Sequence, residues 1–444
     1  MTPFARRLLA IWLLGLLVRG VFLLSEPPTG PVADERMWVV WGADELPSAA
    51  VAFSPLRFRL IFHPPLYPYF IGLLSTLGGL EAVKWGQILV ASLLAPVLGL
   101  LGRRVFRPDV GLAAAAIAAF YPELVWFSVH FWVEAIFVVV LYLAFERLVA
   151  ADERSSWALA AAAGALFGIS VLARETALYF LPFCALFLAF HRPGGGRRAA
   201  VLLLAAFLTI APWTLRNYLV YGAFVPVSTA GALNLWQGNT RLSRQEVYEE
   251  SWAVRGRIEK YHHARRKGLE AILERQPLWI FEKLAAEMPM FWEADSQVLV
   301  HIRRGAYGAV APARALLAAV VVLLPYLVLL GLFVGGLLWA PITRGSVLLL
   351  GFLGYYVLLH VATHGYARYR LPVLPVLFLV AAAGLVARRV HPRPAPARRR
   401  KLVAAAVAAT LLVALVPSLR LLADHRALGL PDPGDRTTEE VDEP

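Results

Sequence analysis

The chain has 444 residues, of which 59% are hydrophobic and 16% are charged, with a mean hydropathy of +0.63. Soluble domains carry about 25% charged residues, so a soluble fold is excluded and lipid must surround most of the chain. The net charge of +13 does not indicate a nucleic-acid partner, because the basic residues form short clusters between apolar segments. The single cysteine, Cys184, excludes a disulfide within the chain.

Apolar segments long enough to cross a bilayer recur along the whole chain. They predict an all-α polytopic membrane protein with about eleven transmembrane helices. We interpret the first segment as an uncleaved span, because Arg19 interrupts it and no small-residue cleavage site follows. The predicted spans are 5–25, 84–102, 110–128, 132–149, 156–173, 176–190, 199–219, 312–339, 345–362, 371–387 and 402–420.

Arginine-rich loops alternate with these spans, which predicts a cytoplasmic N-terminus. The apolar segment 66–80 would invert every later loop if it were counted as a span, and it is short. We therefore expect it to lie in the membrane interface. The basic loops carry Arg6-Arg7, Arg103-Arg104-Arg107, Arg147 and Arg154, Arg192 with Arg197-Arg198, Arg344, and the run from Arg388 to Lys401.

The spans divide the chain into four parts. Residues 1–220 form an N-terminal membrane module that includes the first outer loop, 26–83. Residues 221–311 form a large periplasmic loop, in which stretches such as 246–275 predict amphipathic surface helices, although an ordinary solvated loop domain fits as well. Residues 312–421 form the C-terminal transmembrane module, and the acidic tail 422–444 is expected to be disordered.

Acidic residues and arginines occur at the outer ends of many predicted spans. A charged side chain at membrane depth costs free energy, so these residues are candidates for a functional site. Nucleotide sugars and ATP are cytoplasmic, and no Gly-rich phosphate loop is present. A lipid-linked sugar fits this side of the membrane, because its phosphate leaving group needs arginines and its acceptor needs one carboxylate base. The residues are Arg19, Asp34, Glu35, His63, Glu123, Glu134, Arg174, Glu175, Arg216, His364, Arg368 and Arg370.

Several motifs occur in a characteristic order. They are Asp34-Glu35 with Trp38 and Trp41, His63-Pro64-Pro65-Leu66-Tyr67, Tyr121-Pro122 before Glu134, GISVLARET at 168–176, the stretch 211–239, and HGYARYRLPVLP at 364–375. With these motifs the sequence resembles the glycosyltransferase C superfamily over about residues 10–390. It is similar to the dolichyl-phosphate-mannose–protein mannosyltransferase family and to the bacterial lipid A aminoarabinose transferase.

The resemblance implies a bundle of many spans with interfacial helices in the first outer loop, and an inverting transfer from a polyprenyl-phosphate sugar. It also implies that Asp34 is the catalytic base. Asp44-Glu45 repeats the same dipeptide but lies farther from the first span. Many relatives have a tyrosine where Trp38 stands, which leaves the acceptor side open.

Further residues at the predicted outer face are candidates for catalysis or for substrate binding. Glu134 is predicted to be a second catalytic acid or the ligand of a divalent cation, and no cofactor is assigned with certainty. The alternative for each arginine is that it extends to lipid headgroups. Predicted to bind substrate are Glu35, His63, Lys84, Arg174, Arg216, Arg368 and Arg370.

The hypothesis is a hexosyl- or pentosyltransferase of the bacterial inner membrane whose active site faces the periplasm or exterior. The donor is a polyprenyl-phosphate sugar, and the acceptor is a glycan, a lipid or a protein. Three alternatives stay open: a lipid-linked oligosaccharide flippase or exporter, a polymerase or ligase that uses pyrophosphate-linked glycans, and a scaffold without activity. Transporters often have inverted repeats and broken helices, and the sequence shows neither.

Overall fold

The computed structural model describes residues 1–27, 30–32, 34–44, 59–390 and 398–423. Within these ranges the regular structure is helical and no β-strand occurs, so the predicted all-α class is confirmed. Glu45, most of the basic loop before Lys401 and nearly all of the acidic tail lie outside the described residues.

The helices of the first half are α1 (Pro3–Ser25), α2 (Asp34–Val39), η1 (Val40–Asp44), α4 (Arg59–Phe62), α5 (Leu66–Ser92), α6 (Leu94–Val105), α7 (Pro108–Phe120), α8 (Pro122–Phe127), α9 (Glu134–Arg154), α10 (Trp157–Ala173), η2 (Glu175–Phe180), α11 (Leu181–Ala189) and α12 (Gly195–Tyr221). The second half contains α13 (Ala230–Asn239), α14 (Arg244–Ala253), α15 (Arg257–Leu273), α16 (Trp279–Trp292), α17 (Gln297–Arg303), α18 (Pro312–Trp339), α19 (Arg344–Ala362), η3 (Ala367–Val373), α20 (Leu374–Val390) and α21 (Arg398–Ala423).

Apolar helices of membrane-spanning length identify a multi-pass membrane protein. Among the described residues, six helical segments are long and apolar enough to cross a bilayer, and three shorter apolar helices accompany them. Each predicted span coincides with at least part of a helix. The number of crossings and the orientation of the chain stay predictions.

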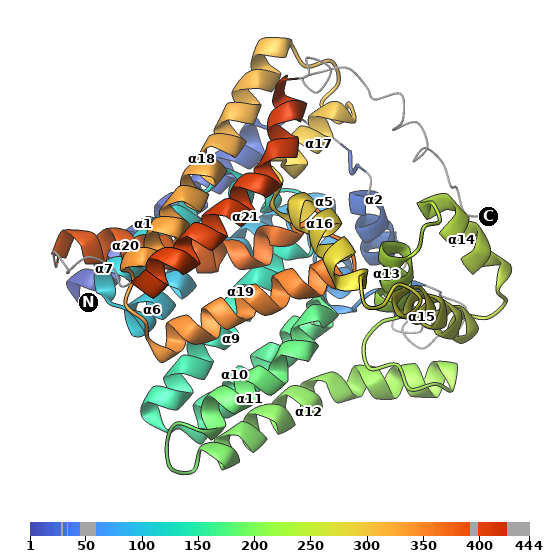
Figure 1. Cartoon of the computed structure of the whole chain (residues 1–444), viewed down its shortest axis with the longest axis horizontal. Helices are drawn as coiled ribbons and strands as arrows, with labels where there is room; N and C mark the ends of the chain where they lie inside the picture. The colour runs from blue at the N-terminus through green and yellow to red at the C-terminus, as the bar shows by residue number, and fades with distance from the viewer. Residues whose placement is uncertain (28–29, 33, 45–58, 391–397, 424–444) are drawn as a thin grey trace.

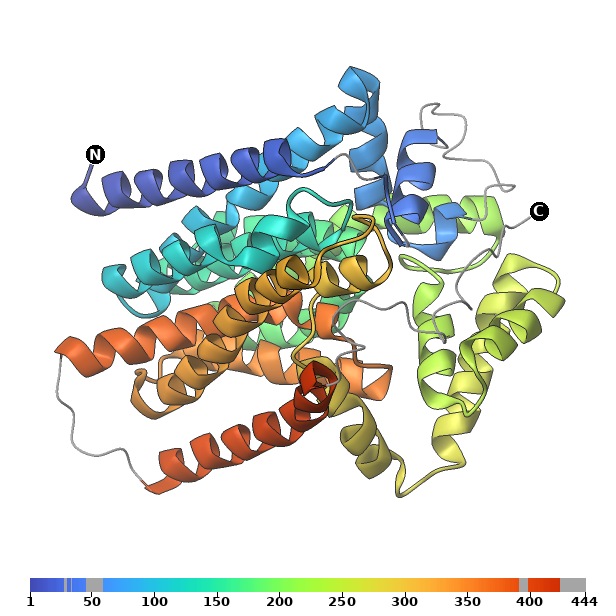
Figure 2. The ribbon, with the colours of Figure 1, turned by 90° about the horizontal axis from the view of Figure 1, so that it is seen from above.

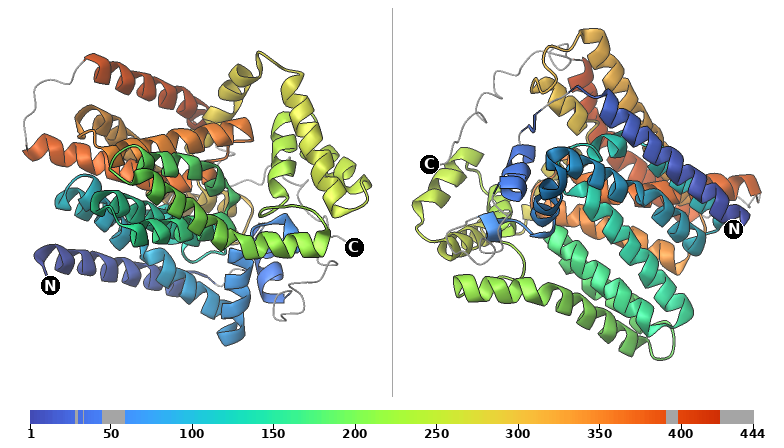
Figure 3. Two further views of the ribbon diagram at one scale, coloured as in Figure 1. Left: turned by 90° about the horizontal axis from the view of Figure 1, so that it is seen from below. Right: turned by 180° about the vertical axis from the view of Figure 1, so that it is seen from behind.

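The long helices lie side by side and give the molecule two distinct ends (Figures 1 and 2). The start of α1 lies at one end, together with α6, α7 and α20. The short helix α2 and the helices α13, α14 and α15 lie at the opposite end, and the two views of Figure 3 show the same separation. The arginine-rich and the acid-bearing loops thus lie at different ends of the bundle.

The segment 66–80 forms the first part of α5 and continues toward the next predicted span. Gly78 and Gly79 interrupt the helix, and Gly79 has φ +64°, a conformation that glycine adopts without a steric cost. After this kink the chain passes with a single break at Leu93 into α6. The kink falls close to the boundary predicted between the interfacial segment and the span, and the depth of 66–80 in the membrane stays a prediction.

Two further predicted helices are interrupted in the structure. The span 110–128 is wrong as a single helix, because α7 ends at Phe120 and Tyr121 has an extended backbone with ψ 118°. The helical conformation is disfavoured before a proline, and Pro122 follows. The stretch 246–275 is likewise two helices, α14 and α15, separated at Gly256 with φ +89°.

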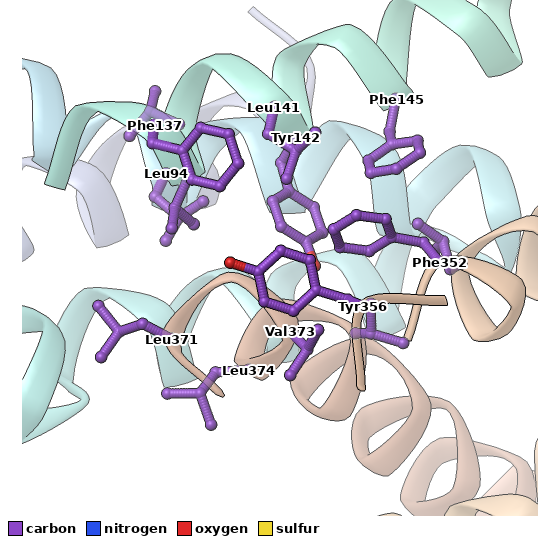
Figure 4. Close-up of a cluster of buried hydrophobic side chains, with 14 of the residues drawn as sticks. Leu94, Phe137, Leu141, Tyr142, Phe145, Phe352, Tyr356, Leu371, Val373 and Leu374 are labelled. Carbon is purple, nitrogen blue, oxygen red and sulfur yellow. The ribbon is translucent and has the colours of Figure 1, made fainter. Parts of the chain in front are cut away.

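Aromatic residues of α9 and α19 meet in the centre of the bundle (Figure 4). Tyr142 and Tyr356 are fully buried there, beside Phe145 and Phe352. The Tyr142 hydroxyl donates a hydrogen bond of 2.8 Å to the carbonyl of Pro372, which satisfies a buried polar group. This contact ties α9 to η3, the segment that carries Arg368 and Arg370.

Small residues let α10 approach α12 closely. A Cβ atom on Gly164 would lie 2.1 Å from the carbonyl oxygen of Leu202, whereas a Cβ atom on Gly351 in α19 would meet nothing within 4 Å. We therefore expect Gly164→Ala to separate the two helices and destabilise the protein by about 1–3 kcal/mol, the usual cost of overpacking. Gly351→Ala is the control and should leave stability unchanged.

The buried thiol of Cys184 provides the measurement, since a thiol-reactive dye reaches it only as the protein unfolds. The melting temperature should fall for Gly164→Ala alone. Equal melting temperatures of the two variants would contradict the close approach of α10 and α12.

Candidate active site

An aspartate and an arginine meet at the end of the bundle that carries α2. Asp34 begins α2, where a carboxylate is favoured by the helix dipole, and Oδ2 accepts a hydrogen bond from Nη1 of Arg368 in η3. Burial alone would raise the pKa of the Asp34 carboxyl, but the Arg368 guanidinium outweighs it and lowers that pKa below its usual value. Asp34 is therefore an ionised carboxylate at neutral pH.

A second ion pair lies beside the first. Glu134 is the first residue of α9, Arg174 ends α10, and Arg174 Nη1 donates to Glu134 Oε1 at 2.5 Å. The ring of Tyr369 joins the pairs, because its centroid lies 5.5 Å from the Arg174 guanidinium and 5.2 Å from that of Arg368. The structure thus brings four of the predicted residues together from α2, α9, α10 and η3.

His63 borders the carboxylate from the first outer loop. Its ring lies 5.1 Å from that of Trp38 and 4.7 Å from that of Trp41. Burial lowers the pKa of His63 to about 3, although the charge of Asp34 acts in the opposite direction. A neutral imidazole beside Asp34 can exchange hydrogen bonds with a sugar without adding a charge.

Two polar atoms in this region are buried and lack a hydrogen-bond partner within the described part of the chain. They are Oε2 of Glu134 and Nε1 of Trp132, and the Arg368 guanidinium lies 5.1 Å from the Trp132 ring. Buried polar groups in native proteins are nearly always paired. The orphaned acceptor and donor thus indicate a site that binds a polar ligand.

The loop that carries Arg368 is held by the second outer loop. Lys283 Nζ in α16 donates to the carbonyl oxygens of Gly238 and Thr363 and to Glu287 Oε1, each at 2.6 Å. Glu287 in turn accepts from the backbone N–H of Gly365 at 2.7 Å. These contacts fix the backbone just before η3.

Arg370 points away from Arg368 and has a different role. It is 1% exposed, and it donates to the carbonyl oxygens of Glu293 at 2.7 Å and of Asp295. Its Nη2 lies 3.9 Å from Glu123 Oε2. Arg370 thereby closes the connection between α16 and α17 and does not join the cluster around Asp34.

The remaining predicted residues contact other side chains. Glu35 is 2% exposed and turns into the protein. The ammonium of Lys84 lies 3.5 Å from Glu81 and 6.0 Å from the Phe131 ring, and Arg216 stacks 4.8 Å from the Trp213 ring and 5.2 Å from the Tyr221 ring. Their roles in substrate binding stay predictions. Arg19 instead donates to the carbonyls of Gly15, Ala118 and Ala119, which fastens α1 to α7.

Sequence reasoning missed two further charged residues near Asp34. Arg304, at the end of α17, acts on the Asp34 carboxylate electrostatically, and His301 on the same helix pairs with Glu35. Both belong to the large outer loop, where charged residues are frequent, so the sequence offers no signal that separates them from solvated neighbours.

A divalent cation at Glu134 stays a prediction. Among the described residues no group of three or more histidine, cysteine, aspartate or glutamate side chains is arranged to hold a metal ion. The partner of Glu134 is the Arg174 guanidinium, which already supplies a positive charge at this carboxylate.

The architecture is similar to that of known glycosyltransferase C proteins. ArnT from Cupriavidus metallidurans, solved bound to undecaprenyl phosphate, matches with a TM-score of 0.50 and 15% identity over 91% of this chain and 63% of ArnT. The oligosaccharyltransferase AglB from Archaeoglobus fulgidus, in complex with an inhibitory peptide and a dolichol-phosphate, matches with a TM-score of 0.49 and 14% identity over 97% of this chain and 57% of AglB. The chain therefore spans less than two thirds of each.

A family model agrees with the fold. The model of the dolichyl-phosphate-mannose-protein mannosyltransferase family matches residues 62–215, a range that includes His63, Glu134 and Arg174. No curated protein sequence matches the chain. The resemblance to the glycosyltransferase C superfamily that the motifs indicate is confirmed.

The two arginines of η3 should respond differently to substitution. Arg370→Met leaves buried carbonyls and Glu123 without their cation, so we expect a loss of about 3–5 kcal/mol in stability. Arg368→Met removes a side chain that is 22% exposed at the site and should cost far less stability. The Cys184 thiol assay measures both, and equal losses for the two variants would contradict the division of roles.

Proposed function

We propose that the protein is an inverting glycosyltransferase that moves a hexose or pentose from a polyprenyl-phosphate donor to an acceptor at the outer face of the membrane. The observation that carries the proposal is the meeting of the Asp34 carboxylate with the guanidinium of Arg368, beside the pair formed by Arg174 and Glu134. The bacterial inner membrane, the periplasmic orientation and the identity of the acceptor as glycan, lipid or protein belong to this proposal.

The charges suit a phosphate leaving group. A polyprenyl phosphate leaves as an anion and needs no proton, but it needs cations that hold its charge through paired hydrogen bonds. Arg368 and Arg174 contact the same Tyr369 ring, so one phosphate can reach both guanidinium groups. A glycoside hydrolase would need two carboxylates in acid and base roles, whereas here each carboxylate has an arginine partner.

Asp34 is suited to act as the base. The acceptor hydroxyl or amine gives its proton to the Asp34 carboxylate while its oxygen or nitrogen attacks the anomeric carbon. The bond from that carbon to the phosphate oxygen breaks, and its electron pair leaves with the polyprenyl phosphate. When Arg368 turns to the donor phosphate, the proton affinity of Asp34 rises, because the contact that lowers its pKa is weakened.

The comparisons favour a lipid monophosphate as the donor carrier. ArnT was solved with undecaprenyl phosphate, and the family model is named for a dolichyl-phosphate-mannose donor. A flippase or exporter would carry the glycan without cleaving it, and a polymerase or ligase would use a pyrophosphate carrier.

Lipids that co-purify with the protein distinguish these functions. We expect mass spectrometry of the protein, extracted in native lipid discs, to detect polyprenyl monophosphate or its monosaccharide ester, enriched over bulk membrane lipid. A pyrophosphate-linked oligosaccharide as the enriched species would overturn the donor assignment. The Arg368→Gln variant should lose the enrichment, since it lacks a cation for the phosphate.

Replacement of the base tests the mechanism. In reconstituted protein supplied with polyprenyl-phosphate hexoses and pentoses and an envelope fraction of the source cells, wild type should release free polyprenyl phosphate. We expect Asp34→Asn to reduce this rate by about 100- to 10,000-fold, the usual contribution of a general base.

The matched control is Asp109→Asn. Asp109 pairs with Arg107 at 3.0 Å, is 54% exposed and lies in the first turn of α7 at the other end of the bundle. Its replacement should leave the rate unchanged. Full transfer by Asp34→Asn would remove Asp34 from its role as the base.

A further inference from the structure

Behind Asp34, the side chain of its neighbour Glu35 is held by three groups. Glu35 Oε1 accepts from the backbone N–H of Phe131 at 2.9 Å. Its Oε2 accepts from the N–H of Val32 at 3.1 Å and lies 3.2 Å from Nε2 of His301. Burial would raise the pKa of this carboxyl, but the hydrogen bond to His301 and the charge of His130 lower it. Glu35 therefore joins the start of α2 to α17 and to the segment before α9.

The surroundings of His301 define its protonation. Its Nδ1 lies 2.9 Å from the carbonyl oxygen of Gln297, and its Nε2 faces the Glu35 carboxylate. A carbonyl and an ionised carboxylate can only accept hydrogen bonds. Both ring nitrogens must therefore donate, which requires an imidazolium ion. The side chains of His301 and Glu35 are both 2% exposed.

A second histidine–glutamate pair, His130 with Glu26, lies beside the first. His130 Nδ1 lies 3.0 Å from the carbonyl oxygen of Trp126, and Nε2 lies 3.1 Å from Glu26 Oε1. The Trp126 ring stacks at 3.8 Å on His130 and meets the edge of His301 at 4.7 Å. The Tyr307 hydroxyl donates to Glu26 at 3.2 Å. The two histidines and two glutamates thus lie close together, and the Tyr307 hydroxyl also lies 3.3 Å from Nε2 of His130.

The remaining charges of the neighbouring elements are engaged elsewhere. Arg303 pairs with Asp295 at 2.6 Å, and Arg304 acts on Asp34. Glu123 of α8 lies beside Arg370, and Arg314 of α18 is exposed. Within the described ranges, the titratable groups that face His301 are thus Glu35, the histidine and glutamate of the second pair, and Tyr307.

We propose that His301, as an imidazolium ion, is a positioning residue for Asp34. It pulls Glu35 against α17, and Glu35 sets the first turn of α2 and hence the place of the carboxylate that meets Arg368. Through His301, the second outer loop thereby positions Asp34, the proposed catalytic base in the first outer loop. The proposal deepens the proposed function, since it rests on Asp34 as the base.

The charge of His301 can be measured without a substrate. Full-length protein labelled with ¹⁵N-histidine, in lipid bilayers near neutral pH, should give an imidazolium signal that is absent from the His301→Gln variant. In Glu35→Gln this signal should change to that of a neutral ring, because the carboxylate that stabilises the charge is gone. A neutral His301 in the wild-type protein would overturn the proposal.

The position of Asp34 provides the second readout. The ¹³C-carboxyl signal of Asp34, assigned by its absence from Asp34→Asn, should titrate in Glu35→Gln and in His301→Gln with an approximately tenfold higher proton affinity than in wild type. The cause is a looser contact with Arg368. An unchanged titration in both variants would overturn the positioning role.

The matched control is His263→Gln. His263 pairs with Glu250 at 3.1 Å between α15 and α14, outside the site, so its loss should change neither signal. Where a donor is turned over, His301→Gln should lower kcat on the order of 100-fold, with little change in KM for the donor. If wild type consumes no donor, the proposed function fails, whereas the two spectroscopic results still decide whether His301 positions Asp34.

Discussion

Arg368 and Asp34 lie 334 positions apart in the chain, and their hydrogen bond joins the first outer loop to the segment before α20. Without this contact, the half-exposed Asp34 carboxylate and the largely buried Arg368 guanidinium would each lack an oppositely charged partner. The pair is possible because α2 and η3 are each anchored independently, α2 through Glu35 and η3 through the contacts of Lys283 and Arg370. The candidate site thus depends on two rigid supports that converge on one ion pair.

The two arginines of η3 show how one short segment serves both support and chemistry. In a 3-10 helix, with three residues per turn, positions two apart project in different directions. Arg370 is directed to the backbone carbonyls that follow α16, and Arg368 to Asp34. A guanidinium with five donors can satisfy several carbonyls at once, which a lysine at position 370 would not do in the same planar geometry.

Hydropathy and arginine placement predicted the all-α class, the approximate spans and the end of the bundle that carries the acids. The average hydropathy of 110–128 did not reveal the break before Pro122, because hydropathy does not record the backbone restriction that a proline imposes on the preceding residue. For the site, the order of the sequence motifs predicted functional roles for Asp34, Glu134, Arg174 and Arg368, and the structure brings these four residues together. The role of His301 could not be predicted, because its partner Glu35 is 266 positions away and only the folded chain shows that both ring nitrogens face acceptors.

Trp38, where many relatives have a tyrosine, shows how a departure from the family pattern can act at a distance. Its side chain is 6% exposed and packs between the rings of Trp41, Tyr67 and His63, so it does not itself line an open site. The larger indole fills the space behind His63 and keeps that imidazole desolvated, which holds its pKa low. A neutral ring beside an ionised Asp34 offers hydrogen bonding to a sugar or an acceptor without competing with Arg368 for the carboxylate. We therefore expect Trp38 to influence the acceptor side through His63, while the arginines supply the positive charge of the proposed site.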